Sequence, residues 1–307
     1  MNSSISGALI SVYSFLVIVT VAFGIVRLLK GPGKMISELI QRTLSWWGIL
    51  TIATVCLFLN DIVATVSLMA LSIFTFQEII SKYNLSETHS RVLRISYIAI
   101  PIQYVLAYFD MFDTFLIFIP VFGFFALSLR SIATGKTQEI SKSIGVVHWS
   151  LMMTVFTFSH IALLYHHNFP GISSDRKYAL VFFLLLVTEL NDIFQFTWGK
   201  LFGKHKITPE ISPKKTVEGL VGGILSSMAL SWSLASFIGV TETHAVILGF
   251  LISFIGFFGD ITFSAVKRDL NIKDLGSSIP GHGGLLDRVD SLALTSMVFF
   301  YAIKLMH

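Results

Sequence analysis

The chain has 307 residues, of which 54% are hydrophobic and only 13% are charged, with a net charge of +4 and a single cysteine. Soluble domains carry roughly a quarter charged residues, so this composition excludes an ordinary soluble protein and indicates an integral membrane protein. The lone Cys56 excludes an intramolecular disulfide, and we expect no nucleic-acid partner.

Apolar runs recur along nearly the whole chain and leave no room for a soluble domain. The first run lacks a basic leader and a small-residue cleavage site, so we expect a retained helix and not a signal peptide. Several runs are shorter than the roughly 20 residues of a comfortable span, and 44–76 fits either two helices or one re-entrant element. We predict an all-α, polytopic fold of about ten transmembrane helices, give or take one: 6–26, 44–59, 62–76, 95–109, 115–129, 144–165, 178–198, 219–240, 245–263 and 292–306.

Lysine and arginine gather in alternate loops between these runs, whereas the intervening turns carry Asp61, Asp110, Asp113 and Glu242. Short cytoplasmic loops are enriched in basic residues, so the phasing predicts that the basic loops, and the motifs beside them, face the cytoplasm. The exception is the Arg176 and Lys177 pair. Ten crossings then put both termini outside.

The first polar segment is 188–223, which contains the lysine-rich stretch "GKHKITPEISPKKTVEG". Lys214 and Lys215 supply mobile positive charges, and Ser212 and Thr216 stand beside the start of a predicted helix, whose backbone amides favour anions. This pattern indicates a phosphate-binding loop. The alternative is an ordinary cytoplasmic loop followed by a capped helix.

The second segment, 259–274, reads "GDITFSAVKRDLNIKD". On a helix, Asp260, Ser264, Lys267 and Arg268 fall on one face. An acidic side chain at the end of a membrane span is costly without a partner, so Asp260 is a candidate site residue. The alternative is a self-contained ion pair between Asp260 and Lys267.

The third segment, 277–292, reads "SSIPGHGGLLDRVDSL". Asp287 and Asp290 fall on one face of a helix that begins near Leu285, where two carboxylates repel each other unless a cation lies between them. Mg²⁺ fits this pair because it prefers oxygen ligands and shares its shell with substrate phosphates. The glycines before the helix allow main-chain amides to approach phosphates, and His282 and Arg288 flank the acids. His282 fits equally well as a turn residue.

The stretch from Ser264 to Asp290 resembles the signature of the phosphatidate cytidylyltransferases, also called CDP-diacylglycerol synthases. The matching positions are a Ser, Lys-Arg, Lys-Asp, Pro-Gly-His-Gly-Gly and Asp-Arg-x-Asp. Upstream, "SPKKTVEG" and the "GD" at 259–260 are also similar to family motifs. The resemblance covers the C-terminal part of the chain, 188–307; the first half resembles only generic membrane helices.

This resemblance implies that a phosphatidate oxygen attacks the α-phosphorus of CTP, giving CDP-diacylglycerol and pyrophosphate, with Mg²⁺ as cofactor. It implies metal binding by Asp260, Asp287 and Asp290. We assign catalysis to Asp287, Asp290, Lys267 and Arg268. Substrate binding is assigned to Ser212, Lys214, Lys215, Thr216, Ser264, Lys273, His282, Gly283 and Arg288. Asp192 and Glu218 also occupy family motif positions, without an assigned role.

We therefore expect a CTP:phosphatidate cytidylyltransferase of phospholipid biosynthesis in the bacterial inner membrane, with N-terminal helices over 1–177 and a catalytic region over 178–307. The chain reads "NDIFQF" at 191–196, without the Ala-Tyr pair that many bacterial members have after the aspartate, so another lipid phosphate or a polyprenol remains an alternative. A transporter is a more distant alternative. Small residues at Gly219, Gly222, Gly223 and Ser226 suit close helix contact within one chain or in a homodimer.

Overall fold

The computed structural model describes residues 60–83, 87–133, 135, 140–172, 176–278 and 283–307, and only scattered positions between 13 and 59. For 87–91 it describes the backbone alone. The predicted spans 6–26 and 44–59 therefore lie largely outside the described residues.

The described part of the chain is almost entirely helical. Two π-helical segments, η1 and η2, continue neighbouring α-helices, and one hairpin interrupts the helices. The helices are α3 (Asp61–Ile80), α4 (Glu87–Tyr108), α5 (Phe112–Ile117), η1 (Phe118–Gly123), α6 (Phe124–Ile132), α7 (Ile140–Leu151), η2 (Met152–Phe156), α8 (Thr157–His166), α9 (Lys177–Phe202), α10 (Val217–Ser233), α11 (Ala235–Ile238), α12 (Glu242–Asp269) and α13 (Leu286–Met306).

Within the described residues, six helical stretches are long and apolar enough to cross a membrane, judged by length and composition. They are Asp61–Ile80, Phe112–Ile132, Ile140–His166, Lys177–Phe202, Glu242–Asp269 and Leu286–Met306. Helix α4 adds a shorter apolar stretch, Val92–Tyr108, and α10 is also short at 17 residues. The all-α membrane fold is confirmed, whereas a count of ten spans stays a prediction.

The lysine-rich segment is not a plain loop. Strands β1 (Lys206–Thr208) and β2 (Ser212–Thr216) pair antiparallel, with Lys206 opposite Thr216 and Thr208 opposite Ser212. Isoleucine and threonine residues favour strands, and Pro209 and Glu210 occupy the turn between them. The hairpin carries the predicted phosphate-binding residues as a shaped element.

Helices α3, α10 and α12 each begin with a side-chain cap. Asn60 Oδ1 accepts the backbone N–H of Val63 at 2.8 Å, and Thr216 Oγ1 accepts that of Gly219 at 3.1 Å. Thr241 plays the same part at the start of α12. Such caps satisfy amides that have no partner inside the helix. The residue before α13 is Leu285, which has no side-chain acceptor.

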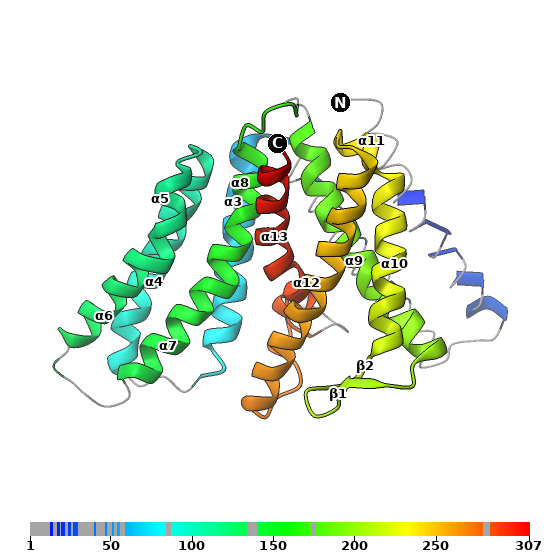
Figure 1. Cartoon of the computed structure of the whole chain (residues 1–307). Coiled ribbons are helices and arrows are strands. Elements are labelled where there is room, and N and C mark those ends of the chain that lie inside the picture. Colours follow the sequence, from blue (N-terminus) through cyan, green and yellow to red (C-terminus); the bar gives the residue numbers. More distant parts are fainter. Residues whose placement is uncertain are drawn as a thin grey trace.

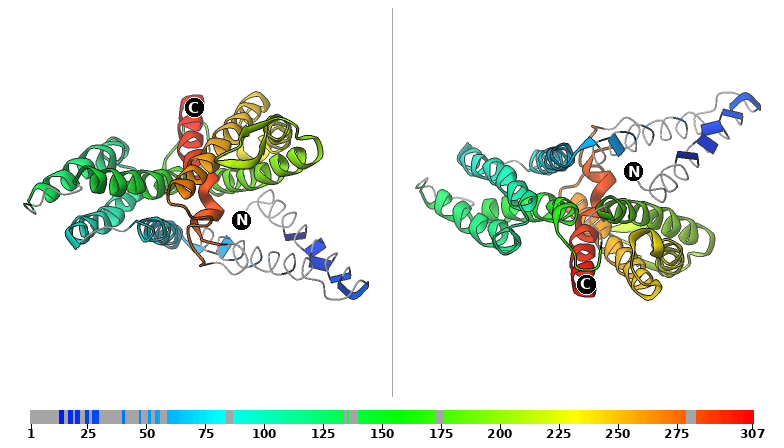
Figure 2. Two further views of the ribbon diagram at one scale, coloured as in Figure 1. Left: turned by 90° about the horizontal axis from the view of Figure 1, so that it is seen from below. Right: turned by 90° about the horizontal axis from the view of Figure 1, so that it is seen from above.

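The helices form one bundle in which α9, α10 and α12 lie on one side and α4 to α7 on the other (Figure 1). Helices α3, α8 and α13 lie between these groups, and the end-on views show the same order (Figure 2).

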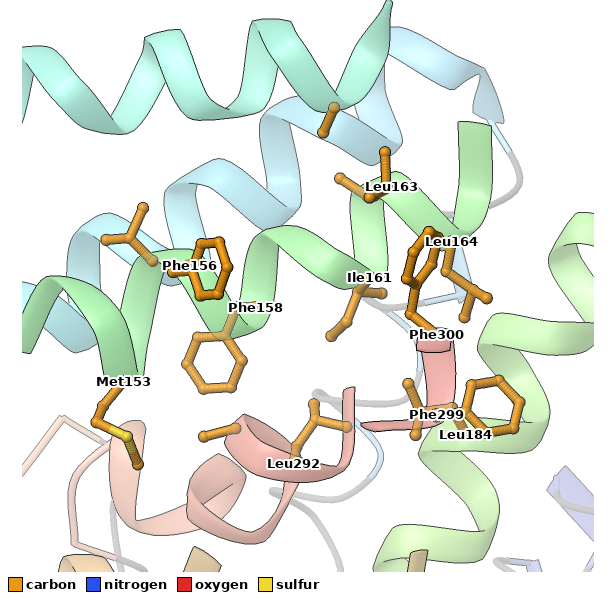
Figure 3. Close-up of a cluster of buried hydrophobic side chains, with 14 of the residues drawn as sticks. Met153, Phe156, Phe158, Ile161, Leu163, Leu164, Leu184, Leu292, Phe299 and Phe300 are labelled. Carbon is orange, nitrogen blue, oxygen red and sulfur yellow. The ribbon is translucent and has the colours of Figure 1, made fainter. Parts of the chain in front are cut away.

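Buried side chains of α8, α9 and α13 form the centre of this bundle, as Figure 3 shows for Phe158, Leu184 and Leu292. Ser296 Oγ of α13 also donates to the Thr157 carbonyl of α8, at 2.8 Å. Elements of the two predicted regions thus pack against each other, and the boundary at 177 stays a prediction.

The small residues of α10 make contacts within the chain. A Cβ added at Gly219 would lie 2.7 Å from the Gln195 carbonyl, and one at Gly222 would overlap the ring of Trp198. Both partners belong to α9, so these glycines allow α9 and α10 to pack closely. The homodimer stays a prediction.

Candidate active site

Four elements bring the sequence motifs together: the second half of α9, strand β2, the second half of α12 and the start of α13. In Figure 1 these segments lie in the half of the bundle that carries the β1–β2 hairpin. The motifs lie far apart along the chain, and helix packing alone places them side by side.

Lys215 and Asp260 form the first ion pair of the site. Lys215 Nζ lies 2.7 Å from Asp260 Oδ2 and also donates to Gln195 Oε1 at 3.1 Å. Ser264 Oγ donates to the other oxygen, Asp260 Oδ1, at 3.1 Å. The predicted face shared by Asp260 and Ser264 is confirmed. The alternative pairing of Asp260 with Lys267 is wrong, because the strand lysine reaches this carboxylate and Lys267 turns to other partners.

The charge of Lys215 is firmly held. Burial opposes the protonated form, but the carboxylates of Asp260 and Asp192 outweigh it, so the pKa of Lys215 is raised above its usual value. Lys215 therefore remains a cation at neutral pH and presents a fixed positive charge at the inner end of the hairpin.

Lys267 forms the second cation of the site. Its Nζ lies 2.9 Å from Asp287 Oδ1 and 3.8 Å from Asp290 Oδ2. The repulsion predicted between Asp287 and Asp290 is thus relieved, in this arrangement, by a lysine between them.

Asp287 holds the loop before α13. Its Oδ2 accepts the backbone N–H of Leu275 at 2.8 Å and that of Gly284 at 3.0 Å. The expectation that loop amides point at phosphates is therefore wrong for Gly284, whose amide is occupied by this carboxylate. Gly283 has φ +86°, in the left-handed region that favours glycine, and an added Cβ would lie 3.3 Å from Asp287 Oδ2.

Asp192 of α9 completes the acidic cluster. Its Oδ2 accepts from Ser291 Oγ at 3.0 Å, while its buried Oδ1 has no hydrogen-bond partner. The charges of Asp192, Asp260 and Asp290 act on one another. Asp192 occupies a family motif position to which the sequence analysis assigned no role, and its charge contacts place it in this cluster.

These residues fit a divalent cation that is shared with a substrate. Four carboxylates, of Asp192, Asp260, Asp287 and Asp290, face two ammonium groups, which leaves excess negative charge, and Asp192 Oδ1 is an unused oxygen. Among the described residues, no three acidic, histidine or cysteine side chains converge closely enough to hold an ion alone. Mg²⁺ typically takes only one or two carboxylates, together with substrate phosphates. Metal binding stays a prediction.

Other predicted residues lie at the periphery. Arg268 is exposed and donates to the Ile211 carbonyl at 3.2 Å, so it ties α12 to the hairpin. Thr216 caps α10, as predicted by the alternative of an ordinary loop followed by a capped helix. Lys214 and Lys273 are exposed at the same end, Ser212 and Arg288 are partly buried, and His282 lies outside the described residues.

Glu218 anchors the hairpin to α10. Its Oε2 accepts the backbone N–H of Lys204 at 3.0 Å and that of His205 at 3.2 Å, and its Oε1 lies 2.6 Å from His205 Nδ1. This gives the motif glutamate a structural role. Because Lys215 is on the same hairpin, Glu218 also helps to place the site cation.

The family model described as "Cytidylyltransferase family" matches residues 40–306 of the chain. The chain belongs to this family.

One relative, named uncharacterized protein YnbB, from Escherichia coli K12, is 38% identical over 278 residues, which is 89% of this chain and 90% of that protein. A phosphatidate cytidylyltransferase of Bacillus subtilis is 33% identical over 50% of this chain and 62% of its own length. One of Staphylococcus aureus (strain COL) is 38% identical over 36% of this chain and 44% of its own length. The relatives named phosphatidate cytidylyltransferase thus match only part of the chain.

Proposed function

We propose that the protein is a CTP:phosphatidate cytidylyltransferase. A phosphate oxygen of phosphatidate attacks the α-phosphorus of CTP, the bond from that phosphorus to the β-phosphate bridging oxygen breaks, and pyrophosphate leaves. The product is CDP-diacylglycerol. Family membership makes the protein a nucleotidyltransferase and leaves no support for the transporter alternative; phosphatidate as the acceptor is supported by the names of the partial relatives.

One observation carries the proposal. Two partly buried lysines, Lys215 and Lys267, from different elements stand among four carboxylates in one half of a membrane bundle. Charges of this density are costly beside lipid and are kept where a polyanionic reaction needs them. The arrangement combines cations for phosphates with carboxylates for a metal.

The chain has no need of a protein nucleophile for this reaction, because the attacking oxygen belongs to the lipid. Catalysis of phosphoryl-type transfer rests on positioning and on charge neutralisation. Lys215 and Lys267 supply fixed positive charge beside the reacting phosphates, and Ser264 and Gln195 hold Asp260 and Lys215 in place. A bound Mg²⁺ would be held by one or two of the carboxylates of Asp192, Asp260 and Asp290 together with substrate phosphates, and it would neutralise charge on the nucleotide phosphates.

The site lies at the end of the bundle, where a lipid headgroup reaches water while its acyl chains stay in the bilayer. We assign this end to the cytoplasmic face of a bacterial inner membrane, because the basic loops gather there. The partners are CTP, phosphatidate and membrane lipids.

The proposal is tested with the purified full chain in detergent or nanodiscs. CTP labelled on its α-phosphate is incubated with phosphatidate, an ether-lipid phosphate or a polyprenyl phosphate, with Mg²⁺ or with EDTA. We expect label in lipid and equimolar pyrophosphate with phosphatidate, and loss of both in EDTA. Lys215→Gln serves as the inactive control, and Glu210→Gln, at the exposed hairpin turn, as the matched active control.

Transfer to another lipid phosphate in preference to phosphatidate would correct the acceptor and keep the reaction class. No lipid labelling with any acceptor, from protein that is folded and binds CTP, would overturn the proposal. Equal transfer with Mg²⁺ and with EDTA would overturn the metal assignment.

A further inference from the structure

The start of α13 depends on a residue far away in the sequence. Helices α3, α10 and α12 carry their own capping side chains, but α13 follows Gly283, Gly284 and Leu285, which offer no side-chain acceptor. Its first amides still need partners, since a helix start leaves several N–H groups unsatisfied.

Glu78, in the last turn of α3, supplies these partners. Its Oε1 accepts the backbone N–H of Leu285 at 3.0 Å, and its Oε2 accepts that of Leu286 at 2.8 Å. Ser278 Oγ of the same loop also donates to Oε1. A carboxylate at a helix start is favoured further by the helix dipole.

The loop is shaped around this carboxylate. A Cβ added at Gly284 would lie 2.9 Å from Glu78 Oε2 and 2.7 Å from the Gly276 nitrogen, and one at Gly276 would overlap Glu78 Oε1. Real Cβ atoms do not approach that closely, so Gly276 needs glycine because of the Glu78 carboxylate, and Gly284 needs it because of both that carboxylate and the Gly276 backbone. These contacts give a reason for Gly284, which the sequence analysis had linked to phosphate binding, and for Gly276, which it had not explained.

We propose that Glu78 is a positioning residue of the active site. The first turns of α13, whose backbone amides donate to Glu78, carry Asp287 and Asp290. Asp287 in turn accepts the backbone N–H of Gly284, in the loop that Glu78 also binds. Glu78 thereby sets where both carboxylates stand relative to Lys267. The inference deepens the proposed function and rests on it for the role of Asp290.

The test compares Glu78→Ala and Glu78→Gln with Gln77→Ala, a matched control at the neighbouring exposed position on α3. Each purified full-length variant is measured for kcat, for KM of CTP, for thermal unfolding, and for hydrogen exchange of the peptides that cover 275–290. A displacement of the reacting groups by an ångström can cost about 100-fold, so we expect a loss of that order in kcat for Glu78→Ala, with little change in KM. Glutamine keeps one acceptor oxygen but turns an NH₂ toward the second amide, and we expect a loss of about tenfold.

Faster exchange at 283–290 in both Glu78 variants, with α12 peptides unchanged and the control like the wild type, supports the proposal. A lowered unfolding temperature with normal kcat per folded molecule would show a structural role alone and overturn it, as would unchanged exchange at 283–290. If Glu78→Ala does not fold, Glu78→Gln decides by the same criteria. If the wild type transfers no cytidylyl group, the proposed function fails, while the exchange experiment still decides whether Glu78 holds α13.

Discussion

Asp287 and Asp290 are chemically alike and three positions apart, yet their surroundings differ. Asp287 has only 2% of its side chain exposed, and both of its oxygens are occupied, by Lys267 and by two backbone amides. Asp290 accepts the Ser291 amide with one oxygen and stands 3.8 Å from Lys267 with the other. Asp287 thus holds the loop together, whereas Asp290 has capacity left for a ligand.

Asparagine at these two positions should therefore have different effects. Asp287→Asn turns an NH₂ group toward a donor and removes a charged hydrogen bond worth about 1.5–3 kcal/mol, so we expect a lower unfolding temperature together with loss of activity. Asp290→Asn should leave the unfolding temperature near that of the wild type and reduce transfer by about 100-fold or more. Thermal unfolding and cytidylyl transfer on the same preparations measure both effects. Equal unfolding temperatures for the two variants would contradict this division of roles.

The two adjacent lysines of the hairpin give a second comparison. Lys215 is paired with Asp260 in the site, whereas Lys214 is exposed. Lys215→Gln leaves a partly buried carboxylate without its cation, and we expect kcat to fall by about 100-fold. Lys214→Gln removes a solvated charge and should act on the KM of CTP by about tenfold or less. Wild-type kcat in Lys215→Gln would exclude its catalytic role.

The pH dependence of the Lys215 pair follows from the sign of its shift. The folded-state pKa is raised above the ordinary 10.5, so the stabilising contribution is fully present below that value and is lost only as the pH rises through the higher folded-state value. Loss of activity near neutral pH would have to come from another group.

At the scale of the elements, the sequence predicted where the helices run but not which side chains of different elements meet. Apolar runs placed α3, α9, α12 and α13, and helical spacing correctly put Ser264 beside Asp260. The same spacing offered Lys267 as the partner of Asp260, because periodicity relates residues only within one helix. The actual partner, Lys215, comes from a strand whose position depends on tertiary packing.

Two further features carried no local signal. The hairpin lies in a stretch that is rich in lysine, proline and glycine, a composition typical of loops, and Glu218 fixes it through contacts to Lys204 and His205. Glu78 is a single acidic residue at the end of an apolar helix, and acidic residues are common at such positions near the membrane surface. Its role depends on amides more than 200 positions away.

The packing of α12 on α13 sets the separation of the acidic groups and can be tested at one glycine. A Cβ added at Gly259 would lie 2.9 Å from the Asp290 carbonyl, so Gly259→Ala must push the two helices apart. Such overpacking costs about 1–3 kcal/mol, and we expect both the unfolding temperature and activity to fall. Gly145→Ala is the matched control, because nothing lies within 4 Å of its added Cβ. A tolerated Gly259→Ala would show that the helix contact does not control the site.

At the scale of the whole molecule, charge is distributed unequally between the two ends of the bundle. The end with the site carries the hairpin lysines and Lys142 at the start of α7, whereas Asp61 and Glu242 begin helices at the other end. The other end has its own basic residues, Arg176, Lys177 and Lys304, and Lys177 is neutralised by Asp61 at 2.8 Å. Membrane proteins retain basic residues on the cytoplasmic side, so this distribution of charge favours an orientation in which the site opens to the cytoplasm.

This orientation predicts the accessibility of single cysteines at the two ends. With the native Cys56 replaced by serine, Glu210→Cys places a thiol at the hairpin turn and Asp113→Cys places one at the exposed start of α5. A membrane-impermeant maleimide added to intact spheroplasts should label Asp113→Cys and should label Glu210→Cys only after lysis. Labelling of both in detergent is the control for thiol reactivity. CTP is found inside the cell, so the opposite pattern would place the lysine and aspartate cluster on the side without nucleotide and would contradict cytidylyl transfer as its function.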